Sequence, residues 1–210
     1  GKSTIARLIP RFFDVQEGAV LVGGQDVRSI PTAELMEQIS FVFQEVHLFK
    51  KSIRDNIRAA RPNATEEEIL HAAHLAQCGD ILEKIPGGLD AVIGAKGVYL
   101  SGGEMQRIAL ARAILKDAPI VVLDEASSFA DPENEVKIQK AFEVLMKGKT
   151  VLMIAHRLST VRRMDRILVI KKGVIVEEGK HDELIEKGGV YASMWEEYQS
   201  AAQWKVGGEA

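Results

Sequence analysis

The first four residues of the chain match the end of a phosphate-binding loop. In the full pattern, G-x-x-x-x-G-K-[ST], backbone N–H groups cradle phosphates, the lysine reaches the terminal phosphates and the hydroxyl ligates Mg²⁺. The chain begins Gly1-Lys2-Ser3-Thr4, so the last glycine, the lysine and the hydroxyls are present but the front of the loop is not. We therefore expect a nucleotide site here, and we expect the sequence to be truncated within it.

Two acidic residues follow an aliphatic run. The run Ile120–Leu123 is typical of a strand buried on both faces, and Asp124 and Glu125 come directly after it. Two carboxylates at that place are costly unless a cation or a substrate proton uses them. Asp124 therefore suits a hold on Mg²⁺, and Glu125 suits the activation of a water for attack on a phosphate. Two solvated acids at the start of a loop are the alternative.

Ser101 and Glu104 have the spacing of a capping box, which by itself predicts only the start of a helix. Between them stand Gly102 and Gly103, and a glycine in a helix costs about 1 kcal/mol of helix stability. Their presence favours close approach of another group to the backbone. A helix N-terminus with bare N–H groups and a serine hydroxyl is a phosphate-binding surface, so both interpretations can hold together.

Gln44 and His156 each come just after a predicted strand. The amide oxygen of Gln44 can join a Mg²⁺ shell without adding charge, and the imidazole of His156 can hydrogen-bond a terminal phosphate or an attacking water. Taken alone, each has an ordinary explanation, namely a solvated loop glutamine and a structural histidine. The one cysteine, Cys78, is expected to be a small core residue.

Strands and helices alternate at both ends of the chain, and the middle is helical. Ligands of open parallel sheets bind beyond the carboxyl ends of the strands, where these candidate residues fall. The predicted strands are Ala19–Val22, Ser40–Phe43, Ile120–Leu123, Thr150–Ala155 and a hairpin of Arg166–Ile170 with Val174–Glu177. The predicted helices are 4–9, Ser101–Lys116, Pro132–Lys147, 181–187 and 189–200. Two further helices are predicted to start at Ser52 and Thr65, and Pro86–Gly88 is predicted to break the helical middle of the chain.

The predicted organisation is a first part of an α/β core (1–49), a helical subdomain (50–116), a second part of the core (117–200) and a frayed tail (201–210). Its 210 residues, 46% hydrophobic and 27% charged, suit a soluble globular chain. A net charge of −3 gives no sign of nucleic-acid binding, and one cysteine excludes an internal disulfide and fits a reducing compartment. No apolar run approaches the ~18 residues of a membrane span.

The order and spacing of these motifs resemble the nucleotide-binding domain of an ATP-binding cassette (ABC) transporter. The resemblance covers residues 1 to about 200. The matching motifs are the Walker A end (Gly1–Thr4), the Q-loop (Gln44), the signature motif (Leu100–Glu104), the Walker B end (Leu123–Glu125), the D-loop (Ser128–Asp131) and the switch histidine (His156). The resemblance implies a P-loop NTPase (RecA-like) parallel-sheet core with an inserted helical subdomain, its N-terminal strands missing.

Finer features are similar to the exporter-type branch, in which a membrane domain precedes the cassette. They include Arg11–Asp14, Ser52–Ile57, Ala155–Thr160, Glu178–Leu184 and Gly189–Tyr191. Three motifs depart from the pattern. The signature ends in Glu104 where glutamine is commoner, the D-loop carries Phe129-Ala130 in place of Ala-Leu, and Ala95 replaces a glutamate before the signature.

The resemblance implies that the intact parent binds ATP with Mg²⁺ and hydrolyses the ATP to power export of an unknown substrate through ATP-driven dimerisation. It implies nucleotide binding by Gly1, Lys2, Ser3, Thr4, Ser101, Gly102, Gly103 and Asp131, metal binding by Ser3, Gln44 and Asp124, and catalysis by Glu125, His156 and Gln44. Ser101 and Gly103 would serve the ATP of a second cassette, in a homo- or heterodimer, since the helical insertion carries them away from the chain's own ATP. The partners would include an upstream transmembrane domain, at the cytoplasmic face of the plasma (inner) membrane, and no nucleic acid.

Two alternatives stay open at the level of the sequence. The first is a non-transport ABC ATPase of DNA repair or translation, which would usually show long coiled-coil insertions or tandem cassettes, and neither is present. The second is a fragment that is inactive on its own, because the front of the phosphate loop supplies several backbone donors. On that second basis we expect the isolated chain to bind ATP poorly.

Overall fold

The computed structural model describes residues 1–43, 45–94, 98–124, 132–155 and 158–207. The chain forms two compact units. The larger unit is Ala6–Ile154, and the smaller one joins Gly1–Ile5 to Ala155–Ala210. The division predicted from the sequence, at residues 49, 116 and 200, stays a prediction.

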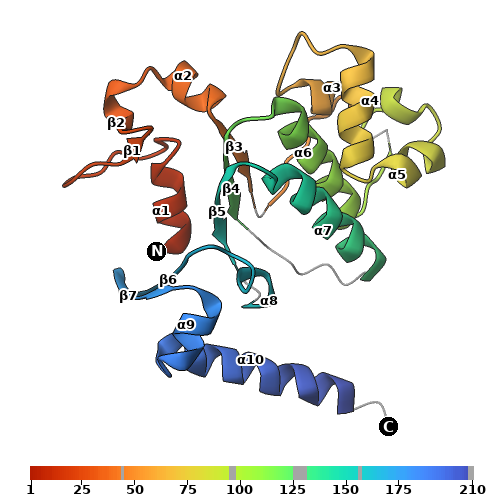
Figure 1. Ribbon diagram of the computed structural model, residues 1–210. Helices are drawn as coiled ribbons and strands as arrows, with labels where there is room; N and C mark the ends of the chain where they lie inside the picture. Colours follow the sequence, from red (N-terminus) through yellow and green to blue (C-terminus); the bar gives the residue numbers. More distant parts are fainter. Residues whose placement is uncertain (44, 95–97, 125–131, 156–157, 208–210) are drawn as a thin grey trace. The chain divides into compact units, whose positions relative to one another are not determined.

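A three-stranded parallel sheet lies at the centre of the larger unit (Figure 1). Its strands are β3 (Ile39–Val42), β4 (Ile120–Asp124) and β5 (Thr150–Ile154), in that order. The strands are in register, with Val42 beside Leu123 and Leu123 beside Met153. Parallel neighbours need long crossover connections, and helices supply them here. The predicted parallel strands are confirmed to within a residue at each end.

Both faces of this sheet are buried, because alternate residues of each strand enter different apolar clusters. On β4, Val121 and Leu123 pack with the helices of residues 53–146, whereas Val122 packs with Ala6 and Leu35 on the other face. Figure 1 shows α6 and α7 beside one face of the sheet. This two-sided burial explains why β4 has a continuous aliphatic sequence.

Four helices of the larger unit begin at the residues that the sequence predicts. Ser52 caps α3 by accepting a hydrogen bond from the N–H of Asp55, and Thr65 and Glu68 form the predicted capping box of α4. The predicted break at Pro86–Gly88 is also confirmed, since Gly87 has a φ of +90°. The helices that lie wholly or partly in this unit are α1 (Lys2–Leu8, of which residues 6–8 belong here), α2 (Thr32–Glu37), α3 (Ile53–Arg58), α4 (Glu66–Leu75), α5 (Gly79–Lys84), α6 (Gly102–Lys116) and α7 (Pro132–Met146), with short 3₁₀ turns η1 (Val27–Ser29) and η2 (Gly88–Asp90).

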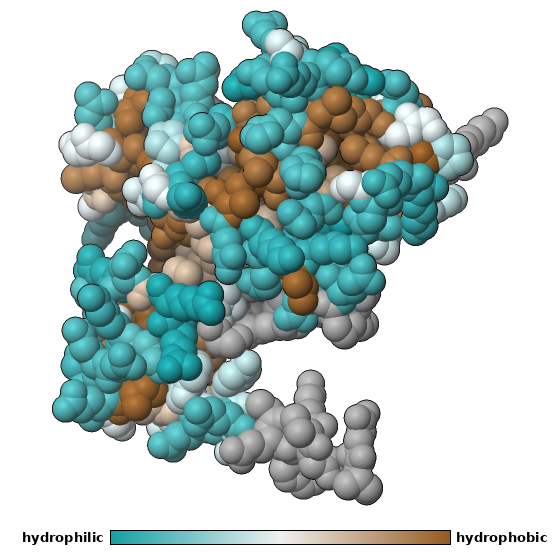
Figure 2. All heavy atoms as spheres, turned by 45° about the vertical axis from the view of Figure 1, so that its right-hand side comes forward, coloured by the Kyte–Doolittle hydropathy of each residue, from teal (hydrophilic) through white to brown (hydrophobic). Residues whose placement is uncertain are grey.

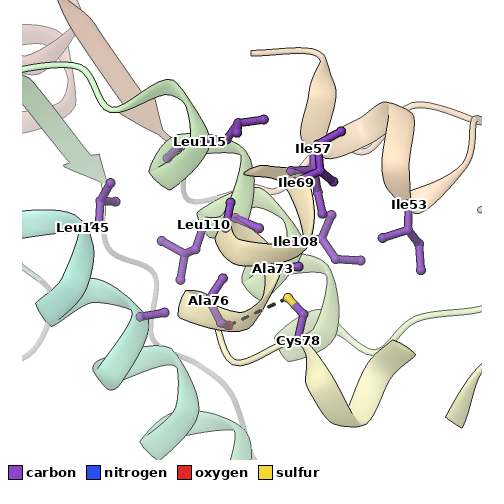
Figure 3. Packing of buried hydrophobic residues seen from close by; sticks show 14 of the residues in the cluster. Ile53, Ile57, Ile69, Ala73, Ala76, Cys78, Ile108, Leu110, Leu115 and Leu145 are labelled. Carbon is purple, nitrogen blue, oxygen red and sulfur yellow. Dashed lines mark hydrogen bonds between the residues drawn. The ribbon is translucent and has the colours of Figure 1, made fainter. Parts of the chain in front are cut away.

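Helix α6 is the centre of the main hydrophobic core. Ile108 and Leu110 on this helix are fully buried and pack among side chains of α3, α4 and α7 (Figure 3). Cys78 belongs to the same core, and its thiol lies 3.8 Å from the carbonyl oxygen of Ala76. Burial raises the pKa of this thiol to about 12. Cys78 is therefore the core residue that the sequence predicts.

The smaller unit contains a helix α8 (Leu158–Val161), a β-hairpin and two further helices. The hairpin pairs β6 (Ile167–Lys171) with β7 (Val174–Gly179), and α9 (His181–Glu186) and α10 (Val190–Gly207) follow it. Glu177 of β7 accepts hydrogen bonds from the backbone N–H groups of Val190 and Tyr191, which fixes the start of α10. A side chain at Gly189 would meet the Glu177 carboxylate, which would have to shift from the position where it accepts these hydrogen bonds.

Several elements differ from the sequence predictions. Helix α1 begins at Lys2 instead of residue 4, β7 ends at Gly179 instead of Glu177, and α2 is not predicted. The predicted strand Ala19–Val22 is shorter, as β1 (Leu21–Val22), and it pairs with an unpredicted strand, β2 (Gln25–Asp26). The predicted end of α10 near residue 200 is wrong, because the helix continues to Gly207. Alanine, glutamine and lysine after residue 200 are good helix formers, so nothing in that stretch stops the helix before the glycines.

No helix in the described ranges combines the length and the apolar character that crossing a bilayer demands. Figure 2 shows hydrophilic side chains over much of the face in view, with apolar groups between them. Phe13, Phe49 and Tyr99 are among the exposed large apolar residues.

Candidate functional site

The carboxyl ends of β3, β4 and β5 lie at one edge of the sheet, as the parallel pairing requires. Asp124 is the last residue of β4, is buried to 6% exposure and pairs in register with Ile154 of β5. A carboxylate at this depth is stable beside cations or hydrogen-bond donors, and carboxylate oxygens are the ligands that Mg²⁺ prefers. Asp124 therefore fits the metal-binding role that the sequence predicts for it.

The segments that leave this edge carry three further predicted residues. Gln44 follows β3 by two positions, Glu125 follows β4 directly and His156 follows β5 by two positions. These three, with Asp131, lie outside the described residues. Three of these residues thus come, in sequence, directly or two positions after parallel strands that end at one edge of the sheet. The roles of the four residues stay predictions.

Helix α1 begins at Lys2, immediately after Gly1. The carbonyl oxygen of Gly1 accepts the N–H of Ile5 at 3.2 Å, which closes the first helical turn. Lys2 and Thr4 are exposed and Ser3 is half-buried, while the space around Gly1 is open. Exposed N–H groups, an ammonium and hydroxyls at a helix start are the donors that a phosphate needs.

The start of α6 forms the predicted capping box. The Ser101 hydroxyl accepts the N–H of Glu104 at 3.2 Å, and the Glu104 carboxylate accepts the N–H of Ser101 at 2.7 Å. Ser101 and Gly102 are exposed, so a ligand can approach them. Gly103 is buried, and a methyl group there would lie 2.9 Å from Cβ and Cγ of Asn134 in α7. The group that approaches the backbone closely at Gly103 is therefore α7 of the same chain.

Glu104 places a negative charge at this helix start. Burial tends to raise the pKa of its carboxyl, but hydrogen bonds from the Ser101 N–H and from Lys84 outweigh burial and lower that pKa. The Lys84 ammonium lies 3.2 Å from the carboxylate. A negative charge at a helix N-terminus stabilises the helix, so the ionised Glu104 carboxylate stabilises α6. The positive charge of Lys84 partly neutralises this carboxylate, which reduces its repulsion of any anion bound nearby.

The comparisons with known proteins agree with this geometry. The family model described as "ABC transporter" matches residues 1–128. The chain belongs to the ABC transporter family. An ABC cassette of α/β P-loop type, with a parallel sheet, is therefore confirmed as the fold class.

Named ABC relatives extend the match over most of the chain. The "ATP-dependent lipid A-core flippase" of Sodalis glossinidius is 51% identical over 195 residues, which are 92% of this chain and 34% of the relative. The flippase of the same name from Escherichia coli K12 is 50% identical with the same coverage. The chain thus spans about a third of the length of these curated relatives.

A solved ABC structure gives the same picture. It is described as "Structure of a bacterial Atm1-family ABC exporter with ATP bound" and superposes with a TM-score of 0.86 at 40% sequence identity. The match covers 94% of this chain and 34% of that chain.

Side chains that the sequence reasoning missed hold the start of α6 in this cassette. The buried guanidinium of Arg107 donates hydrogen bonds to both carboxylate oxygens of Asp80 in α5, at 2.5 and 3.1 Å. Lys137 of α7 donates to the same carboxylate at 2.9 Å. Burial tends to raise the pKa of the Asp80 carboxyl, but these donors outweigh burial and lower that pKa to about 2. A charged Arg107 within the largely apolar α6 sequence is the signal that could have indicated this network.

Proposed function

We propose that this chain is the ATP-hydrolysing cassette of an ABC exporter and that it works as one of two cassettes that close over ATP. The observation that carries the proposal is that one α/β chain combines three features of such a cassette. The end of a phosphate loop starts α1, Ser101 caps α6 and Asp124 ends β4. The exporter assignment is supported by the flippase relatives and by the Atm1-family structure.

The proposed chemistry at the chain's own ATP uses residues at both the helix start and the sheet edge. Gly1 and Thr4 hold phosphate through the backbone and the hydroxyl, and Lys2 neutralises the terminal phosphates. Glu125 accepts the proton of the attacking water, and His156 orients that water and the γ-phosphate. A general base typically contributes ~10²–10⁴-fold to the rate.

The residues proposed for Mg²⁺ are Ser3, Gln44 and Asp124, a set of hydroxyl, amide and carboxylate oxygens. This set matches the oxygen ligands that Mg²⁺ takes, together with waters and phosphates. When bound, the ion would neutralise charge that develops on the transferring phosphate. The burial of Asp124 supports its part in this proposed set.

The proposed partner is a second cassette, whose ATP would meet Ser101, Gly102 and Gly103 of this chain. Two-fold pairing would then make both sites composite, with Asp131 at the junction. We further propose an attached transmembrane domain, which places the cassette at the cytoplasmic face of the plasma or inner membrane. Release of the γ-phosphate would let the two cassettes part, and this opening would drive the transport cycle.

The substrate class that the relatives favour is a lipid of the lipid A-core type, because two relatives at 50–51% identity carry that name. The test is stimulation of ATP hydrolysis by lipid A-core in vesicles of the whole transporter. An equal response to vesicles without that lipid would contradict this substrate class.

The proposed function is tested by Glu125→Gln in the whole transporter. We expect steady-state phosphate release to fall by about 10²-fold or more, because the water loses its base. ATP binding, measured by nucleotide retention on the protein, should stay unchanged.

Glu67→Gln is the matched control, since Glu67 is an exposed carboxylate in the first turn of α4. This control should turn over ATP at the wild-type rate. Wild-type turnover in Glu125→Gln would show that the base, and with it the proposed mechanism, is assigned wrongly.

A further inference from the structure

The first two turns of α6 are held on two sides. On the α5 side, Lys84 pairs with Glu104 and Asp80 pairs with Arg107. On the α7 side, Gly103 lies so close to Asn134 that no side chain fits between them. The exposed Ser101 and Gly102 therefore project from a helix start whose neighbours are fixed.

The contacts to α7 repeat along both helices. Gly103 and Arg107 are four residues apart on α6, and Asn134 and Lys137 are three apart on α7, so each pair lies on one helix face. Gly103 meets Asn134 directly, whereas Arg107 reaches Lys137 through the carboxylate of Asp80. Sliding or rotating α6 against α7 would break both contacts together.

Asp80 is the residue that these contacts share. Its carboxylate accepts hydrogen bonds from Arg107, which is 1% exposed, and from Lys137, which is 25% exposed. Without this carboxylate, the link between Arg107 and Lys137 would be lost, and Lys137 would keep its pair with Glu133 of its own helix at 2.6 Å. Arg107 would keep only its hydrogen bond to the carbonyl oxygen of Gln77, among the partners found in the described part of the chain.

We propose that Asp80 is a positioning residue for the ATP bound by the second cassette. By locking α6 to α5 and α7 one turn beyond Gly103, it sets where Ser101 and Gly102 meet that nucleotide. The inference rests on the proposed function, because it requires that the start of α6 act on the ATP of another chain. It also predicts that loss of Asp80 harms the partner's site and spares the site of its own chain.

A transporter with two distinguishable cassettes tests this asymmetry. In one arrangement, Asp80→Asn and Glu125→Gln are on the same copy, which leaves no site with both an intact base and an intact α6. In the other, they are on opposite copies, which leaves one site fully intact. The measurement is phosphate formed from ATP in a single turnover.

We expect the same-copy arrangement to be about tenfold to a hundredfold slower, since a displacement of ~1 Å at a reacting centre can cost that much. The opposite-copy arrangement should match a transporter with Glu125→Gln on one copy and no other change. Equal rates in the two arrangements would overturn the inference, because a general structural defect would not depend on which copy carries the base.

Three controls separate the possible failures. Asp90→Asn removes a similar carboxylate–arginine pair, to Arg54 at 2.9 Å, away from α6, and should show no asymmetry. Asp80→Glu keeps the charge and should restore the same-copy rate. If Glu125→Gln on both copies leaves hydrolysis unchanged, the proposed function has failed and not the role of Asp80.

Lys137→Met supplies a second variant in case Asp80→Asn folds poorly. It leaves the Arg107–Asp80 pair in place and removes the contact of α7 with Asp80, together with the pair between Lys137 and Glu133 within α7. The same asymmetry, at smaller size, is expected. A symmetric loss in Lys137→Met would again overturn the inference.

Discussion

At the scale of single residues, Gly103 shows how a functional motif can also be a packing requirement. Gly103→Ala would place a methyl group 2.9 Å from two carbons of Asn134. We expect this overpacking to lower the free energy of unfolding by about 1–3 kcal/mol, measured by urea denaturation.

Gly79→Ala is the control for that substitution, because a side chain at Gly79 meets nothing within 4 Å. Its effect should stay within about 0.5 kcal/mol. Adding Asn134→Gly to Gly103→Ala should recover part of the loss, since the clashing carbons are removed. Equal effects of the two glycine substitutions would contradict the packing explanation.

Ser101 and Thr65 offer a matched pair, since each is the first residue of a complete capping box. Ser101→Ala and Thr65→Ala should each cost about 1 kcal/mol of stability, because both lose the same type of cap. In the whole transporter, only Ser101→Ala should slow ATP hydrolysis. A similar loss of hydrolysis in Thr65→Ala would mean that Ser101 acts through stability alone.

Ser40 has a buried hydroxyl on β3 for which no hydrogen-bond partner is found within the described ranges. Leaving a buried polar group unpaired costs stability, so Ser40→Ala should be neutral or stabilising by up to about 1 kcal/mol. Thermal unfolding at pH 7 measures this change. A destabilisation of that size would instead indicate a partner outside those ranges.

At the scale of elements, the cross-links among α5, α6 and α7 give stability a dependence on pH. The pKa of Asp80 is lowered to about 2 in the folded chain, below the ordinary value of 3.8. A carboxyl whose pKa is lower in the folded than in the unfolded chain stabilises the fold at pH values above its pKa in the unfolded chain. This stabilisation is lost as the pH falls through its pKa in the folded chain.

Asp80→Asn should therefore be less stable than wild type at pH 7, by about 1 kcal/mol, a reduced figure because the Asp80 side chain is 45% exposed. The difference should stay constant down to about pH 5, lose nearly half its size by about pH 3 and vanish below about pH 2. Urea denaturation across this range measures it. A difference that grows on acidification would contradict the assignment.

Local sequence patterns predict the elements well where burial or capping decides the structure. The aliphatic run of β4 and the capping boxes at Thr65 and Ser101 are examples. The pairing of Arg107 with Asp80 joins residues 27 positions apart, and Lys137 joins Asp80 across 57, so only the packed helices bring them together. Strand β2 consists of two polar residues and is too short to show a periodic pattern, so the sequence does not predict it.

At the scale of the whole molecule, the chain represents about a third of each transporter that it resembles. The sequence places Asp124 correctly at a strand end, because buried parallel strands are easily identified. It also predicts Gln44, Glu125 and His156 at the ends of the same strands. Their roles depend on a bound nucleotide and on a second cassette, which local patterns do not describe.

Closure of two cassettes over ATP is the prediction that belongs to this scale. Spin labels at position 67 of both cassettes, introduced by Glu67→Cys in a Glu125→Gln transporter, should show a changed and narrower distance distribution when ATP and Mg²⁺ are added. Lys2→Ala should abolish this response, because the phosphates lose their ammonium. Hydrolysis of ATP by the wild type, with no distance change in the labelled protein, would contradict closure.

The buried thiol of Cys78 can serve as a probe of local unfolding in the core. Because burial raises the pKa of this thiol to about 12, very little of it is ionised at pH 7, so alkylating reagents should react with it very slowly in the closed core. Reaction then requires that the packing of α4, α5 and α6 open transiently, and its rate measures how often this happens. Mass spectrometry of alkylated Cys78, with and without nucleotide, would show whether ligand binding suppresses these openings in the part of the cassette that carries Ser101.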